Sequence, residues 1–445
     1  MPLTRDSLSD FFIQGFKKSN DLQVGVEWEK IGVYKKTLKA IRYSGTRGVE
    51  AIFKEMVRRR GWKPVKQGAH IIALEKEGSS ITLEPGGQIE LSGRKSKSLN
   101  NNVLEFYTHL REIKEVSGPL GIVWLGLGAQ PVSSFDQVQW VPKKRYAIMR
   151  ESLKNNGTLT YAMMKETASI QISLDFTSEK DAIEKLRLGF ALAPFLSAMF
   201  ANSPVSQGRL NGFYSRRAHI WRHTAPERTG MIPGIFDPTF NFESYIRFAL
   251  AVPMLFIVRN GRWIPGNRLP FGEFLKNGLG RFRAESADWQ LHLTTLFTDA
   301  RLKQIVEIRS VDCQKSRLGY SVPALLKGIF YDDLSRKKAW RIVSDISLAE
   351  RQRLADEVPR QGLKTRLKNK TLWEPASQLV YLAEEGLNRL VSKKLARTGE
   401  ARYLIPLKEL LIEKKMTPAD LLMGCFKYSK NRKELLSRVL VCAAI

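Results

Sequence analysis

Residues 24–29 read VGVEWE, a short apolar stretch that carries two carboxylates. Side chains alternate between the two faces of an extended chain, so residues two apart point the same way. Glu27 and Glu29 therefore share a face, and the apolar Val24 and Val26 beside them favour a true strand. Because that face must either meet water or serve a ligand, the two acids make this strand the first candidate for a functional site.

A second stretch, IVEIR, ends at Arg309 and repeats the arrangement with opposite charges, since Glu307 lies two residues before the arginine. Glu84 and Glu90 lie in ITLEPGGQIELSG, and Gln171 lies in the middle of SIQISLDF, again on or beside predicted strands. Any one of these acids could lie on the wet face of a sheet. Carboxylates that are held close together, however, raise one another's pKa unless a cation lies between them. Because Mg²⁺ prefers oxygen ligands and substrate phosphates, the five glutamates with arginines nearby predict an ATP site with several Mg²⁺ ions.

The strands and helices that the sequence predicts are mixed without a β-α-β rhythm. Alternation of apolar and polar residues predicts half-exposed antiparallel strands over 24–34, 71–93 (as a hairpin), 121–130, 169–176 and 303–311. Apolar residues at helical spacing predict helices over 47–60, 101–116, 178–201, 243–251, 346–356 and 375–398, and a C-terminal group of helices from 405 to 441. We therefore predict an α+β fold, an antiparallel sheet wrapped by helices, in a single compact domain over residues 1–445 whose part from 320 to 445 is mainly helical.

The chain is strongly basic. It has 445 residues, 43% of them hydrophobic and 26% charged, which is typical of a globular enzyme. Lys and Arg number 72 against 44 Asp and Glu, which leaves a net charge of +28. Such an excess can serve nucleic acid, an anionic membrane or anionic substrates. The charges are scattered through helical patterns, however, and no helix-turn-helix, zinc-finger or RNP-type motif accompanies them. We expect small-molecule substrates as partners, and neither nucleic acid nor a membrane.

Three cysteines occur, Cys313, Cys425 and Cys442, with no CxxC spacing. This usage favours a reducing compartment and excludes both a disulfide framework and structural zinc. We expect all three to be small apolar residues of the core, so that reductant changes neither activity nor gel mobility. Cys425 with Cys442 is the one pair that we consider for a bridge, across two helices.

Two further stretches bear on localisation. The start, MPLTRDSLSDFFIQGFKK, has the pattern of an amphipathic helix with acids inside it rather than that of a signal peptide. The longest apolar run, FALAVPMLFIV at 248–258, is interrupted by Pro253 and is shorter than the stretch of about 20 residues that spans a bilayer. We expect a cytoplasmic protein.

Several common chemistries are excluded by missing motifs. The sequence has no GxxxxGK[ST] and no GxGxxG after a strand, which argues against a P-loop or a dinucleotide-binding Rossmann unit. It has no GxSxG nucleophile elbow, and its five histidines show no HExxH spacing. The strand carboxylates remain as the principal candidates for chemistry.

Five stretches, in this order along the chain, resemble successive motifs of glutamate-cysteine ligases of the plant and proteobacterial type. They are VGVEWEKIGV, ITLEPGGQIELSG, MMKETASIQISLDF, ANSPVSQGRLNGFYSRRAHIW and DWQLHLTTLFTDARLKQIVEIRSVD. Weaker similarity continues through WEPASQLVYLAEEGLNRL and MTPADLLM, so nearly the whole chain is covered. The resemblance implies a fold related to glutamine synthetase, in which an antiparallel sheet forms a funnel with ATP and Mg²⁺ at one end and the amino acids at the other.

The resemblance also implies a reaction and roles for individual residues. ATP would convert the γ-carboxylate of L-glutamate to γ-glutamyl phosphate, and the amine of L-cysteine would displace phosphate, the first step of glutathione biosynthesis. The implied Mg²⁺ ligands are Glu27, Glu29, Glu84, Glu90, Gln171 and Glu307. Arg217 and Arg309 would be catalytic and would hold the phosphoryl oxygens of ATP. Met164, Thr167 and Trp221 would surround the amino-acid substrates, although core packing explains these three about as well.

Some positions depart from the resemblance. The family continues after HIW with a Thr-Asp-Thr-Asp stretch, where this chain has Arg222-His223-Thr224-Ala225; Glu166 and Ala168 replace an Arg-Cys-like pair, and Ser173 replaces an Asn. The predicted metal carboxylates are intact. Two alternatives therefore stay open, a γ-glutamyl ligase that uses a different amine acceptor and a non-catalytic relative that binds nucleic acid. Both a monomer and a homodimer fit the sequence.

Overall fold

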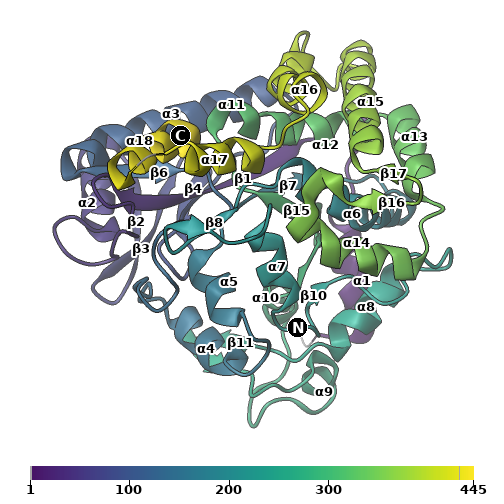
Figure 1. Cartoon of the computed structure of the whole chain (residues 1–445). Coiled ribbons are helices and arrows are strands. Elements are labelled where there is room, and N and C mark those ends of the chain that lie inside the picture. Colours follow the sequence, from purple (N-terminus) through teal and green to yellow (C-terminus); the bar gives the residue numbers. More distant parts are fainter. Residues whose placement is uncertain (1–2, 430) are drawn as a thin grey trace.

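The computed structural model describes residues 3–429 and 431–445. Within these ranges its centre is a nine-stranded sheet in the order β14-β15-β7-β1-β5-β4-β3-β2, with β6 paired to the far half of β1 (Figure 1). The strands are β1 (Val24–Tyr34), β2 (Lys63–Gln67), β3 (His70–Lys76), β4 (Ser79–Leu83), β5 (Ile89–Ser92), β6 (Ile122–Leu125), β7 (Ser169–Leu174), β14 (Ala300–Leu302) and β15 (Val306–Asp312). Every pairing in this sheet is antiparallel. The predicted α+β fold with an antiparallel sheet is confirmed.

Both faces of the central strand β1 are covered. On one face Trp28 stacks on Phe106 of α3 (Leu99–Ser117), with 4.2 Å between the ring centroids. On the other face Glu29 is only 7% exposed. The prediction of half-exposed strands is therefore wrong for β1, because segments distant in sequence close over its polar face. That closure takes Glu29 out of bulk water, whereas Glu27 stays partly exposed.

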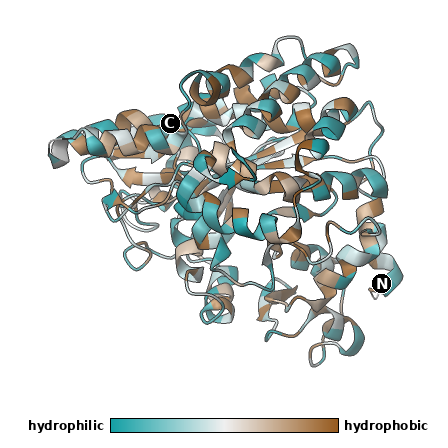
Figure 2. Cartoon of the chain, turned by 45° about the vertical axis from the view of Figure 1, so that its right-hand side comes forward, coloured by the Kyte–Doolittle hydropathy of each residue, from teal (hydrophilic) through white to brown (hydrophobic). Residues whose placement is uncertain are grey.

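The predicted helices recur within a few residues of their predicted ends. They are α2 (Val49–Arg60), α3, α6 (Glu179–Met199), α8 (Phe242–Ala251), α14 (Leu348–Gln361) and α15 (Trp373–Ser392). The predicted C-terminal group of helices from 405 to 441 consists of α16 (Ile405–Lys408), a π-helical turn (Glu409–Glu413), α17 (Pro418–Lys427) and α18 (Arg432–Ala443). Most helices in Figure 2 carry hydrophobic and hydrophilic residues side by side, as expected where one face meets a core. The single-domain organisation of residues 1–445 stays a prediction.

Several short elements were not predicted. They are α4 (Lys144–Leu153), α5 (Thr160–Glu166), α7 (Arg216–Arg222), α9 (Phe271–Asn277), α10 (Ser286–Leu293) and the hairpin of β11 (Phe256–Arg259) and β12 (Arg262–Pro265). Seven to ten residues give only two or three turns, too few for a helical period to be recognised. Across the described ranges, no helix is long and apolar enough to cross a membrane.

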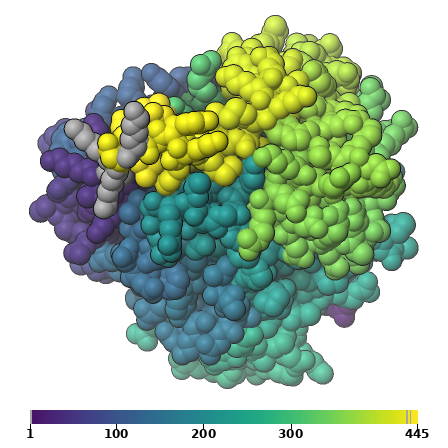
Figure 3. Space-filling view, in the orientation of Figure 1, coloured from purple at the N-terminus to yellow at the C-terminus, as the bar shows by residue number. Residues whose placement is uncertain are grey.

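The C-terminal helices cover a small separate core at the end of β1 and β6. Ile31 and Val33 of β1 pack there with Leu422 of α17 and Val439 of α18. Figure 3 shows this yellow segment lying across the purple and blue N-terminal part of the chain. The chain then runs along β6, where Leu125 bridges Ala444.

The cysteine prediction is wrong for two of the three residues. Cys425 of α17 and Cys442 of α18 are paired as a disulfide, whereas Cys313 is free and buried. The two helices pack against each other through the small core, which brings together cysteines that lie 17 residues apart in sequence. This is the pair that was considered for a bridge, but the sequence does not show how the two helices pack.

Two helices outside the sheet approach each other unusually closely, which gives the first testable prediction. A Cβ added at Gly328 of α12 (Ser321–Tyr331) would lie 2.2 Å from the carbonyl oxygen of Ala383 of α15. We expect Gly328→Ala to lower the free energy of unfolding by about 1 to 3 kcal/mol, because the backbones must separate. Urea unfolding measures the change.

Gly424 of α17 is the matched control, since a Cβ there meets nothing within 4 Å. Gly424→Ala is expected to stabilise the protein by roughly 0.5 to 1 kcal/mol, because alanine favours the helix. Equal unfolding midpoints for the two variants would contradict the close contact between α12 and α15.

Candidate active site

The polar face of the sheet lines a cavity with about 1000 Å³ of empty space. Strands β1, β5, β7 and β15 form its floor, and helices α5 and α7 contribute its side. Ten predicted site residues line it, namely Glu27, Glu29, Glu84, Glu90, Met164, Thr167, Gln171, Arg217, Trp221 and Arg309. The structure thus brings together residues that are up to 282 positions apart, from Glu27 to Arg309.

Strand register sets the spacing of the polar side chains. Glu27 of β1 lies opposite Gln171 of β7, and Glu29 lies opposite Glu90 of β5. Gln171 connects two charges, since its Nε2 donates to Glu29 Oε1 at 2.9 Å and its Oε1 accepts from Arg309 Nη1. Ser169 donates to Glu29 through its backbone N at 2.6 Å and its Oγ at 3.0 Å. Glu29, Gln171 and Arg309 therefore form one hydrogen-bonded array across β1, β7 and β15.

The acids of this array raise one another's pKa. Burial, followed by Glu90 and Glu307, raises the pKa of Glu27 well above its ordinary value. Burial, Glu84 and Glu90 raise the pKa of Glu29 to about 8. Ionising two such carboxylates together requires a compensating positive charge. The donor set and its electrostatics therefore fit a cation in this cavity.

The array is open rather than a closed metal cage. Within residues 3–429 and 431–445, no group of three or more His, Cys, Asp or Glu side chains is arranged to hold a metal ion by itself. Mg²⁺ is commonly held by one or two carboxylates while waters and phosphate oxygens complete its shell. The acids thus fit ions that arrive with a phosphate-bearing substrate. Which of the predicted residues bind Mg²⁺ stays a prediction.

Glu307 does not line the cavity, unlike the other predicted residues. It is 0% exposed, and its carboxylate accepts from Arg301 Nε at 2.6 Å, Lys303 Nζ at 3.3 Å and Arg309 Nη1 at 3.2 Å. Burial alone would raise the pKa of Glu307, but the three cations together hold it well below its ordinary value. In this arrangement Glu307 neutralises and fixes three cations, and its predicted contact with Mg²⁺ stays untested.

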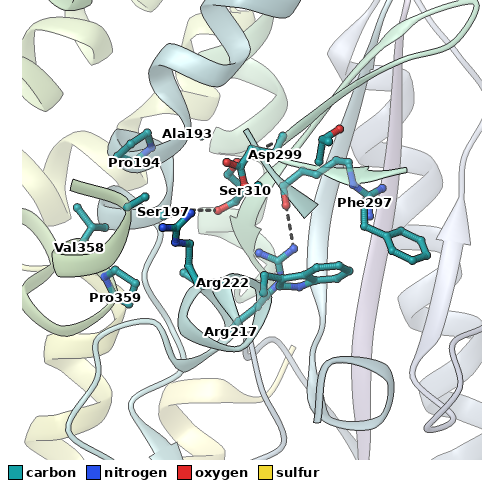
Figure 4. A pocket seen from close by; sticks show the side chains of 16 residues that line it. Ala193, Pro194, Ser197, Arg217, Arg222, Phe297, Asp299, Ser310, Val358 and Pro359 are labelled. Atoms are coloured by element: carbon teal, nitrogen blue, oxygen red, sulfur yellow. Dashed lines mark hydrogen bonds between the residues drawn. The ribbon is translucent and has the colours of Figure 1, made fainter. Parts of the chain in front are cut away.

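A second, narrower cavity adjoins the first. The two share Arg217, Trp221, Phe297 and Arg309, so the two arginines lie between them. In Figure 4 Arg217 and Arg222 enter from the helix below, and Asp299 and Ser310 lie above them. Arg217 Nη2 donates to the backbone oxygen of Arg309 at 2.8 Å.

Comparison with known proteins identifies the family of this fold and site. The family described as glutamate-cysteine ligase family 2 (GCS2) matches residues 23–439. The chain belongs to the GCS2 family. Among its relatives, the chloroplastic glutamate-cysteine ligase of Arabidopsis thaliana is 38% identical over 428 residues, 96% of this chain and 80% of the relative. Ligase B of Oryza sativa subsp. japonica is 36% identical over 434 residues, 97% of this chain and 86% of the relative.

Solved structures agree on the fold. A glutamate-cysteine ligase of Francisella tularensis, determined in complex with AMP, aligns with a TM-score of 0.55 at 12% identity and covers 96% of this chain and 89% of its own. A bifunctional glutathione synthetase of Pasteurella multocida aligns with a TM-score of 0.54 at 10% identity, over 95% of this chain and 52% of its own. These likenesses support the predicted glutamine-synthetase-like architecture.

Sequence reasoning missed several residues of this GCS2 site. Arg301 and Lys303 line the cavity because β14 folds back on β15 and places Arg301 opposite Glu307. A signal existed in ARLKQIVEIR, where two basic residues precede the strand acid by four and six positions. Arg145 and Tyr146 also line the cavity from α4, a helix that was not predicted.

The departures from the family pattern lie at the side of the site. Arg222 lines the second cavity, and its guanidinium is held by Asp356, with Nη2 to Oδ1 at 2.7 Å. Glu166 is buried and pairs with Arg216 at 3.3 Å, directly before the Arg217 of the site. Ala168 is buried in the small core beneath the C-terminal helices. Arg222 and Glu166 thus lie beside the arginines of the site, whereas Ala168 lies in the small core and Ser173 lies opposite Glu307.

Proposed function

We propose that the chain is an ATP-dependent ligase that joins the γ-carboxylate of glutamate to the amine of cysteine, the first step of glutathione biosynthesis. One observation carries the proposal: the predicted acids and arginines meet in one cavity on the sheet of a GCS2-family chain. The names of the plant relatives support the amino-acid substrates. The AMP complex of the Francisella ligase supports an adenine nucleotide as co-substrate.

The residues of the cavity suit a transfer of phosphate to a carboxylate. A γ-carboxylate is a poor electrophile, so its oxygen first attacks the γ-phosphorus of ATP and releases ADP. The amine then attacks the acyl carbon of γ-glutamyl phosphate and releases inorganic phosphate. Both steps gather negative charge on phosphoryl oxygens, which guanidinium forks bind well. Arg309 and Arg217 present their guanidinium groups between the two cavities, where both the phosphoryl group and the acyl carbon can be reached.

Mg²⁺ would be held by Glu27, Glu29, Glu84 and Glu90 with Gln171, and would neutralise the charge that develops on the transferred phosphoryl group. The chain's own contribution is to hold those oxygens in place. Ser169 and Gln171 donate to Glu29, and Thr82 and Ser92 donate to Glu90 Oε1 at 3.0 and 2.8 Å. Glu29 and Glu90 are therefore oriented before any ion arrives.

The second cavity is our proposed location for the amine acceptor. It lies beyond the two arginines as seen from the carboxylate array, so an amine there would approach the acyl carbon from the side away from the acids. Asp299 lines this cavity and could receive the proton that the ammonium must lose. Because Arg222 also lines it, a γ-glutamyl ligase with an acceptor other than cysteine remains the second candidate function.

The direct test is an ADP-release assay on the purified protein. We expect turnover that requires glutamate, cysteine and a divalent cation together, because the acyl phosphate must be consumed by an amine. EDTA is expected to abolish it. Faster turnover with another amine in a panel of amino acids would replace cysteine as the acceptor, and turnover without glutamate would remove the proposed reaction.

Compartment, assembly and charge complete the proposal. We propose that the protein is cytoplasmic and that it is a monomer or a homodimer. The name 'chloroplastic' describes the location of the plant relatives. We propose that the excess of Lys and Arg residues, which gives the net charge of +28, lies on the solvated surface. A non-catalytic nucleic-acid binder would instead bind DNA or RNA with an affinity that falls steeply with added salt, and no ADP release.

A further inference from the structure

Strand β15 contains a shift of strand register beside Arg309, the residue that it contributes to the cavity. Ile308 pairs with Ile172 of β7, but the next pair is Val311 with Ile170, so β15 has one residue more than β7 between these pairs. An extra residue inverts the alternation of side chains beyond it. Arg309 and Asp312, three positions apart, therefore both face the cavity side, where a regular strand would place them on opposite faces.

Asp312 lies opposite Ser169, the residue that donates to Glu29. It is 1% exposed, and its carboxylate accepts three hydrogen bonds from two other segments. The donors are Asn202 N at 2.9 Å, Ser203 Oγ at 2.7 Å and Ser215 Oγ at 2.9 Å. Asp312 is thus the point where β15, the end of the α6 segment and the start of α7 meet.

The same hydrogen bonds fix the helix that carries Arg217. Ser215 is the N-cap of α7, and its Oγ accepts from Ala218 N at 3.0 Å. Ser203 Oγ accepts from the backbone N of Arg217 at 3.1 Å. Both hydroxyls give their protons to Asp312, so the carboxylate orients them as acceptors for the first turn of α7. Arg217 therefore enters the cavity from a backbone that Asp312 holds.

The guanidinium itself is also within reach of this carboxylate. Arg217 Nη1 lies 3.9 Å from Asp312 Oδ1, while Nη2 donates to the backbone oxygen of Arg309 at 2.8 Å. Arg217 is buried, so a nearby negative charge matters more here than at the surface. A carboxylate on one side and a carbonyl on the other leave the guanidinium a single well-defined place between the two cavities.

We propose that Asp312 is a positioning residue that aims Arg217 at the reacting group, and that the bulge in β15 exists to bring Asp312 to this face. The catalytic meaning of this inference rests on the proposed function, since Asp312 acts only through Arg217. It assigns no contact between Asp312 and substrate. It predicts that a substitution at Asp312 lowers the reaction rate even though every side chain that lines the two cavities is unchanged.

The test uses the full chain with Asp312→Asn, Arg217→Lys and the double variant. Asp312→Asn keeps an oxygen acceptor but removes the charge and one acceptor. We expect its kcat/KM to fall by about a hundredfold, mostly in kcat. A displaced guanidinium stabilises the transition state less, whereas its displacement weakens substrate binding to a smaller extent. The double variant should be no slower than the slower single variant. Rate losses that multiply would overturn the proposal.

Asp332 provides the matched control. It is also 1% exposed, and it accepts from Ser335 N at 3.0 Å and from Arg389 Nε at 2.9 Å at the start of α13 (Asp333–Val343). Asp332→Asn removes a buried, paired charge at a distant helix end. It should lower the melting temperature and leave kcat/KM unchanged, and an equal loss of rate would mean that any buried acid has this effect.

A crystal structure of Asp312→Asn decides the matter without any assay. We expect the guanidinium of Arg217 to leave the backbone oxygen of Arg309, and a retained 2.8 Å hydrogen bond would overturn the proposal. If the parent protein released no ADP with glutamate and any amine, the proposed function would fail, while this structural comparison would still decide whether Asp312 positions Arg217.

Discussion

Glu27→Gln is expected to lower kcat about a hundredfold, since loss of one well-placed electrostatic contact typically raises a barrier by roughly 3 kcal/mol. The Glu27→Gln variant is expected to keep the fold of the parent. Burial and the neighbouring Glu90 and Glu307 raise the pKa of Glu27, which means that its negative charge is unfavourable in the folded protein without a cation. A neutral glutamine of the same shape removes that unfavourable charge. We therefore expect a melting temperature, measured without divalent ions, equal to or above that of the parent.

The combination of lost rate and retained stability distinguishes a ligand-binding acid from a structural one. Glu75 of β3 is the control, because it is an exposed strand acid outside the cavity. Glu75→Gln is expected to change neither quantity. Steady-state ADP release and thermal unfolding with EDTA give the two measurements. Near-normal activity of Glu27→Gln would make this acid an ordinary polar residue of the sheet.

Glu307→Gln is expected to act in the opposite way on stability. Its carboxylate compensates Arg301, Lys303 and Arg309 at a position that is fully buried. Removing one partner of a buried ion pair typically lowers the free energy of unfolding by about 3 to 5 kcal/mol, because the remaining charges stay uncompensated. Activity should fall as well, since Arg309 loses one of its two side-chain partners.

Urea unfolding followed by circular dichroism measures this loss. Glu243→Gln serves as the control, because Glu243 pairs with Arg5 at the surface, where side chains are 44% and 60% exposed. Exposed pairs contribute about 0 to 1 kcal/mol. If Glu307→Gln unfolded at the same urea concentration as the parent, the buried cluster would contribute little, and the three cations would be held by other contacts.

Much of the site was predictable because strand alternation is a local property. Glu27 and Glu29 had to share a face once β1 was recognised, and the structure places both on the cavity. The bulge in β15 was not predictable, because nothing in IVEIRSVD marks an extra residue. Regular alternation would place Asp312 on the face opposite Arg309, and its contacts with Ser203 and Ser215 were not predicted.

Elements whose structure depends on distant partners were missed for the same reason. α7 has only seven residues and is capped by Ser215, which in turn is oriented by a strand almost 100 positions later. The hairpin of β14 and β15 turns within Lys303–Ile305 and brings Arg301 to Glu307. The pair Cys425 and Cys442 depends on how α17 packs against α18. Such contacts are properties of the assembled fold.

The contact between β6 and residues 443–445 covers a strand edge that would otherwise be open. One edge of β6 pairs with β1, and along the other the backbone N of Gly126 donates to Ala443 while that of Ile445 donates to Trp124. An open strand edge offers unpaired backbone groups to any passing chain. Residues 443–445 occupy groups on this edge, so a segment of three residues at the margin of the fold satisfies backbone groups of β6 that would otherwise be open to another chain.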